Sequence, residues 1–126
     1  MFRILAVATA AITLFLGFAN LLAGQFVAGR WALAGGDGVI VLSRRIGALY
    51  IGLAVIFILA RNAPPSALRR ALCVGTGLAC ILLASLGTAE WLSGRVSAGI
   101  LSSVVVEAVL GSGFLSCAIK HESRSA

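Results

Sequence analysis

The chain has 126 residues, of which 60% are hydrophobic and only 11% are charged, and it carries a formal net charge of +6. A soluble domain of this length could not bury so much apolar surface, whereas a lipid bilayer accommodates it. The basic residues stand singly or in pairs at the ends of apolar segments, without a basic face of interleaved aromatic residues, which argues against nucleic-acid binding. The composition therefore predicts one integral membrane domain over residues 1–126.

The first apolar segment continues to about Ala23. Its polar interruptions are Thr9, Thr13 and Asn20. A signal peptide also begins with a positive charge, but its apolar core is only about 7–15 residues long. We therefore expect an uncleaved membrane helix over about 4–23, followed by a glycine-rich loop at Gln25–Gly38. The loop lacks the Lys-Ser/Thr pair of a phosphate-binding loop.

The second apolar segment contains two adjacent arginines, Arg44 and Arg45. Only 15 uncharged residues run from Ile46 to Ala60, and at about 1.5 Å per residue they cover about 22 Å of a roughly 30 Å hydrocarbon core. We therefore expect the second helix, over about 41–60, to extend back through both arginines. A cation inside the bilayer is costly unless it reaches the headgroups or pairs with a carboxylate.

Two further apolar segments predict membrane helices over about 70–89 and 97–119. A pair of prolines ends the second helix, and Ser66 is placed to cap the third. A short polar turn from Glu90 to Arg95 precedes the fourth segment, which is interrupted only by Glu107. Small residues occur in all four segments and favour close helix packing. We expect an all-α, antiparallel four-helix membrane bundle with short loops.

Four spans place both termini on the same side of the membrane. That side carries six basic residues and the opposite side carries four, or two if Arg44 and Arg45 are drawn into the membrane. Positive charge concentrates in cytoplasmic segments of membrane proteins. Both termini are therefore expected in the cytoplasm.

Polar side chains of all four predicted helices gather in the half of the membrane remote from the termini. At about 1.5 Å per residue, Tyr50 lies about 15 Å from the terminal side, Glu107 about 18 Å and Arg45 about 22 Å. Asn20 and Glu90 lie somewhat further, at about 24 Å and 28 Å. The predicted intramembrane polar layer consists of Arg44, Arg45, Tyr50, Glu107, Asn20 and Glu90.

An ionised glutamate alone in the middle of a membrane helix is costly, so we expect Glu107 to pair with Arg44 or Arg45. Two interpretations of the layer remain. It is either an internal clamp that fixes how the helices pack, or a site for a small ligand or a proton.

The three cysteines, Cys73, Cys80 and Cys117, lie inside apolar segments, without a CxxC motif or a Cys/His cluster. Cys117 is expected at about the depth of Cys73. A redox pair is one interpretation, and buried cysteines acting as small hydrophobic residues are the favoured one. The only histidine, His121, lies in the polar tail, so haem ligation by paired histidines is excluded. We expect no catalytic site, no cofactor and no metal.

From Arg44 onward the chain has the pattern Arg-x-x-Gly-x-Leu-Tyr-x-Gly-Leu. With the proline-containing turn before Arg69-Arg70, the turn from Glu90 to Arg95 and Glu107, this resembles a family of small bacterial four-helix membrane proteins catalogued as domain of unknown function 4345. The resemblance extends to Ile119. It implies an inner-membrane bundle in which Arg44 or Arg45, Tyr50 and Glu107 are the recurring polar positions, and it implies no activity.

Two positions depart from that family pattern. Ile51 stands where a glycine is expected after Tyr50, and a Gly-Arg pair usual late in the third helix is absent.

The expected function is that of a non-enzymatic interaction or accessory subunit, in contact with the lipid bilayer and with a larger membrane complex or a second copy. The alternative is a protein that binds or transports a small molecule, a proton or an ion through the polar layer. Small multidrug exporters have a similar size and number of spans, but they depend on a carboxylate in the first helix, which this chain lacks. A membrane redox protein would need haem-ligating histidines or a reactive thiol pair.

Overall fold

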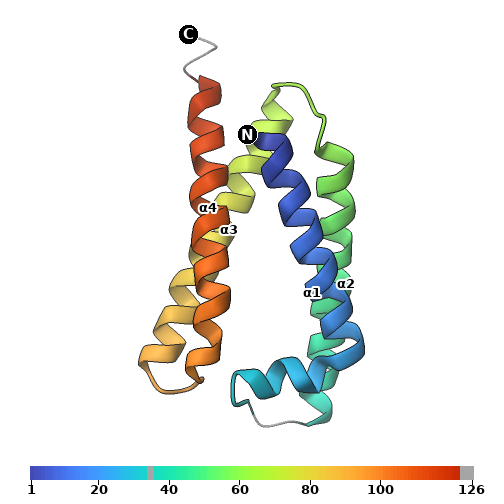
Figure 1. Ribbon diagram of the computed structural model, residues 1–126, viewed down its shortest axis with the longest axis vertical. Coiled ribbons are helices and arrows are strands. Elements are labelled where there is room, and N and C mark those ends of the chain that lie inside the picture. Colours follow the sequence, from blue (N-terminus) through green and yellow to red (C-terminus); the bar gives the residue numbers. More distant parts are fainter. Residues whose placement is uncertain (34–35, 123–126) are drawn as a thin grey trace.

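A computed structural model describes residues 1–33 and 36–122, with side chains to residue 119. Its elements are α1 (Phe2–Arg30), α2 (Asp37–Ala60), α3 (Ala67–Leu92), the short 3₁₀ helix η1 (Ala98–Ile100) and α4 (Leu101–Glu122). Within these residues there are four long helices and no strand, which confirms the all-α prediction. The start of α1 and the end of α4 lie toward the same end of the molecule (Figure 1).

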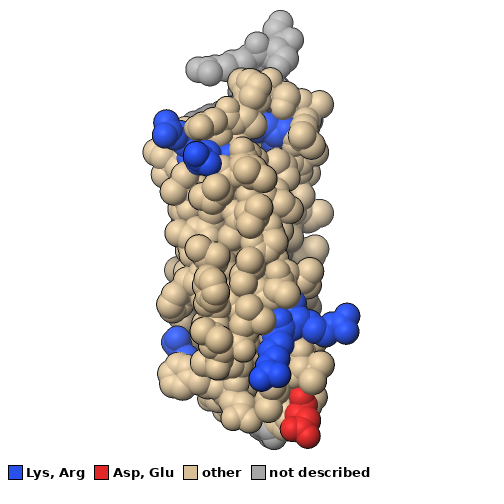
Figure 2. Space-filling view, turned by 90° about the vertical axis from the view of Figure 1, so that its right-hand side faces the viewer, with Lys and Arg blue, Asp and Glu red and all other residues tan. Residues whose placement is uncertain are grey.

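Each of the four helices is long and apolar enough to cross a membrane. Many large apolar side chains point away from the protein, among them Leu22 (84% exposed), Leu59 (77%) and Ile4 (74%). Figure 2 shows one face of the molecule, where basic side chains lie toward the two ends and a broad band between them is uncharged. An uncharged, outward-facing apolar band indicates a multi-pass membrane protein.

The helices pack as two hairpins, α1 with α2 and α3 with α4. In the second hairpin, a Cβ placed on Gly77 would lie 2.8 Å from Leu115 Cγ, and one placed on Gly111 would lie 2.9 Å from Ile81 Cδ1. No larger residue fits at these positions unless its neighbour moves. Such close contact provides the van der Waals attraction that joins helices in lipid, where no hydrophobic force acts between them.

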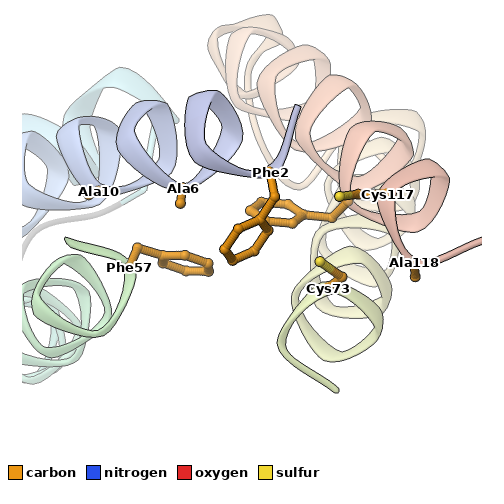
Figure 3. Packing of buried hydrophobic residues seen from close by; sticks show 8 residues of the cluster. Phe2, Ala6, Ala10, Phe57, Cys73, Cys117 and Ala118 are labelled. Atoms are coloured by element: carbon orange, nitrogen blue, oxygen red, sulfur yellow. The ribbon is translucent and has the colours of Figure 1, made fainter. Parts of the chain in front are cut away.

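The two hairpins contact each other much less than their own helices do, and Figure 1 shows them diverging away from the chain termini. At the terminal end they share a buried cluster, drawn in Figure 3, that consists of Phe2, Ala6, Ala10, Phe57, Cys73, Phe114, Cys117 and Ala118. The rings of Phe57 and Phe114 lie 5.5 Å apart, centroid to centroid. The arrangement is therefore more open than a closed four-helix bundle.

A second connection between the hairpins lies at the opposite end. α1 is kinked at Ala23 (φ −135°, ψ 38°), and its last turns run across the molecule in Figure 1. Ser97, the residue before η1, forms two hydrogen bonds with the end of α1. Its Oγ donates to Arg30 O (2.9 Å) and its backbone N donates to Trp31 O (3.1 Å). Residues 25–30, expected in a loop, are thus helical. Of the predicted glycine-rich loop, Ala34 and Gly35 lie outside the described residues.

Candidate functional site

Two residues of the predicted polar layer, Tyr50 of α2 and Glu107 of α4, approach each other from different hairpins. The Glu107 carboxyl is close enough to interact electrostatically with the Tyr50 hydroxyl and with the Cys80 thiol of α3. All three side chains are half-buried. Cys80 also packs against α4 at Gly111, one helical turn beyond Glu107. These three residues, which we call the inter-hairpin triad, bring a carboxyl, a phenol and a thiol within electrostatic range of one another.

Cys80 was not part of the predicted layer, although its position along the helix indicates a depth close to that of Tyr50. Counted from Ala71 it lies nine residues along its helix, about 14 Å deep, which matches the depth of Tyr50. A thiol is only weakly polar and resembles a small hydrophobic side chain, so its depth alone does not mark it as part of a polar layer.

The expected ion pair between Glu107 and Arg44 or Arg45 is not formed within the described residues. Both arginines are exposed on the surface of α2. At about 100° per residue, Arg44 and Arg45 stand roughly 120° and 140° around the helix from Tyr50, which faces Glu107. The arginines therefore reach a suitable depth but point away from the carboxyl.

Arg44 instead lines an open pocket of about 410 Å³ beside the kink in α1. The pocket also contains Asn20, Gln25 and Phe26 of α1 and Ile40 of α2. Asn20 is buried, and its side-chain nitrogen donates to Leu16 O (2.9 Å). The pocket therefore presents the Arg44 cation together with the side-chain amides of Asn20 and Gln25.

The kink that shapes this pocket has a packing cause. A Cβ placed on Gly24 would lie only 2.7 Å from Cβ of the buried Ser43 in α2. α1 and α2 therefore touch just beyond Ala23, where the helix changes direction. Glycine at this position allows the contact.

Glu90, the last member of the predicted layer, forms an exposed ion pair with Arg95 in the turn after α3. It thus belongs to the surface at the end of a helix and has a partner of its own. The six predicted residues are divided among the inter-hairpin triad, the pocket, this turn and, for Arg45, the exposed surface of α2.

Within residues 1–33 and 36–119, no three histidine, cysteine or acidic side chains come together as a metal site. The inter-hairpin triad contains one carboxyl and two weak acids. Its chemistry suits hydrogen bonding, proton binding or contact with a cation.

Comparison with protein-family models finds no match, and comparisons with curated proteins and with solved structures find none either. The resemblance carried by the residues from Arg44 to Leu53 therefore stays a prediction.

Proposed function

We propose that this chain is a non-enzymatic interaction subunit of a larger membrane complex in the bacterial inner membrane, with both termini in the cytoplasm. The observation that carries the proposal is the difference in packing within and between the hairpins. Each hairpin is held by glycine contacts, whereas the two hairpins meet mainly at their ends. A helix from another membrane protein can exchange lipid for protein contact along such faces at little hydrophobic cost.

The inter-hairpin triad gives this interaction a chemical preference. Glu107 is half-buried, faces the other hairpin and has no ion-pair partner among the described residues. A membrane carboxyl in this position gains from a hydrogen-bond donor or a cation supplied by a second protein. The proposed partner is therefore a membrane helix with a basic or hydroxyl side chain at the depth of Glu107.

Photocrosslinking in native membranes tests the proposal. A photoreactive phenylalanine analogue replaces Tyr50, which faces the other hairpin, and in a control chain it replaces Leu59, which is 77% exposed. We expect position 50 to crosslink to one larger membrane protein, which is then also recovered in mild detergent at a fixed ratio. Crosslinks to a second copy of the chain would replace this proposal with self-association, and purely internal crosslinks would refute both.

One observation favours a second function, the binding of a proton, a cation or a small ligand at Glu107. The carboxyl lies within electrostatic range of a phenol and a thiol, two groups that are hydrogen-bond donors when protonated. The purified chain in lipid nanodiscs would then show an infrared carbonyl band for protonated Glu107 that changes with pH or with added cation. The band should be absent from Glu107→Gln, and an unchanged band over the whole pH range would exclude this function.

A further inference from the structure

Two of the three cysteines lie side by side at the end where the hairpins meet. Cys73 of α3 is 1% exposed, Cys117 of α4 is 9% exposed, and their thiols are close enough to interact with each other. In Figure 3 both sulfur atoms lie on the side of the α3–α4 pair that faces Phe2. Both thiols are free in the structure.

The helices that carry this pair approach each other closely. One turn after Cys73, a Cβ placed on Gly77 would lie 3.3 Å from the backbone oxygen of Gly111 in α4. A disulfide needs Cα atoms about 4.4–6.8 Å apart, which ordinary helix pairs with large side chains between them do not allow. The small residues of this interface make that distance attainable.

A cation is fixed against the thiols. The guanidinium of Arg69 lies over the ring of Phe2, 4.4 Å from its centroid, and its Nη2 is 4.0 Å from Cys117 Sγ. Nη1 donates to Ala63 O at 3.3 Å. The Nε–H group is buried and has no hydrogen-bond partner among the residues that the structure describes. Arg69 is thus held beside the thiols with a donor still to be satisfied, and its positive charge stabilises an anion formed there.

We propose that Cys73 and Cys117 are a reversible redox pair whose oxidant is a low-molecular-weight disulfide. Cys117 gives up its proton and its thiolate attacks one sulfur of the oxidant, which forms a mixed disulfide and expels the first thiolate of the oxidant. The Cys73 sulfur then attacks Cys117 Sγ as its own proton leaves, which forms the Cys73–Cys117 bond and expels the second thiolate. The two protons lost by the cysteines end on the two released thiols, so one disulfide is reduced as one is formed.

Cys117 is the first nucleophile because it is the more exposed thiol and the one nearest Arg69. Cys73, the second thiol of the pair, is more deeply buried. In a reducing compartment the pair rests as two thiols, and it closes when disulfides accumulate. Closure ties α3 to α4 within the cluster that joins the hairpins, so the redox state acts on the junction of the fold.

The experiment uses the full chain, reduced and purified in lipid nanodiscs, with oxidised glutathione as the oxidant. Free thiols are then labelled with a maleimide and counted by intact mass, and disulfides are located by peptide mapping. We expect loss of two thiols through a Cys73–Cys117 bond, with Cys80 still labelled. Cys80→Ser should close the same bond, whereas Cys73→Ser should stop at glutathione bound to Cys117.

The substitution Arg69→Gln tests whether the cation promotes disulfide formation, or whether the bond forms only because the two sulfur atoms are close together. It should slow bond formation by roughly fivefold, whereas Arg70→Gln, the same charge change one residue away, should not. Two free thiols at positions 73 and 117 after prolonged oxidation of the wild-type chain would overturn the proposal. So would equal formation of bonds that involve Cys80, since that would reflect general thiol reactivity.

Discussion

Gly17 of α1 and Gly47 of α2 face each other with no room for a side chain on either. A Cβ on Gly47 would lie 2.7 Å from the carbonyl oxygen of Gly17, and a Cβ on Gly17 would lie 3.1 Å from that of Gly47. The two backbones therefore touch directly, and the first hairpin depends on this contact.

Replacing Gly47 with alanine should separate the backbones of α1 and α2. The expected loss in the free energy of unfolding is about 1–3 kcal/mol, because the new methyl group overpacks a contact made by backbone atoms. Gly52→Ala is the matched control, since nothing lies within 4 Å of the Cβ it would add. The control should be neutral or gain up to about 1 kcal/mol of helix propensity. Unfolding by denaturing detergent, followed by circular dichroism, measures both, and equal effects would contradict the packing.

Ser66→Ala should weaken the start of α3. Ser66 Oγ accepts a hydrogen bond from Arg69 N (3.2 Å), as the sequence predicted, and losing such a cap costs about 0.5–2 kcal/mol. Ser66→Asp keeps an oxygen acceptor at the cap and should retain most of the stability. The same unfolding measurement applies, and an unaffected alanine variant would mean that the cap is not formed in the membrane.

Ser97→Ala should loosen the two hairpins at the end remote from the chain termini. The side chain donates to Arg30 O across the hairpins, whereas Ser102 Oγ donates to Gly99 O in the adjoining turn. Spin labels on α2 and α4 should report a broader distance distribution for Ser97→Ala, measured by pulsed electron paramagnetic resonance. The distribution should be unchanged for Ser102→Ala, and broadening by both variants would show that the hydrogen bond to Arg30 is not the connection.

Glu107→Gln should leave stability nearly unchanged or raise it. No ion pair of Glu107 would be broken, and a half-buried carboxyl is replaced by a neutral group of the same shape. Removing one partner of a buried ion pair costs about 3–5 kcal/mol. A loss of that size in detergent unfolding would show that Glu107 does pair with an arginine. Arg45→Gln is the control and should also have little effect.

Properties that run along a helix could be predicted from this sequence. Hydropathy locates the four helices, and the serine before Ala67 predicts the cap on α3. Residue counting also placed Cys117 at the depth of Cys73, its actual neighbour.

Properties that depend on rotation about a helix could not be predicted. Arg44, Arg45 and Glu107 match in depth, yet the arginines point away from α4 because of their angular position relative to Tyr50. The kink at Ala23 was missed for a related reason, since it arises from contact between Gly24 and Ser43 of another helix. A single sequence contains the spacing along each helix but not the angle at which each helix faces its neighbours.

The cluster at one end of the hairpins has a mechanical consequence. Its buried aromatic rings resist separation, whereas the opposite end is joined by hydrogen bonds of Ser97 alone among the contacts described above. Leu101, the first residue of α4, lies 13 residues and therefore about 20 Å from Phe114, so a rotation of about 5° at the rings of Phe57 and Phe114 displaces that end of α4 by about 2 Å. A change in bilayer thickness or lateral pressure acts over that whole length. A small change in the angle between the hairpins therefore moves the end remote from the chain termini while the packing at the rings is kept.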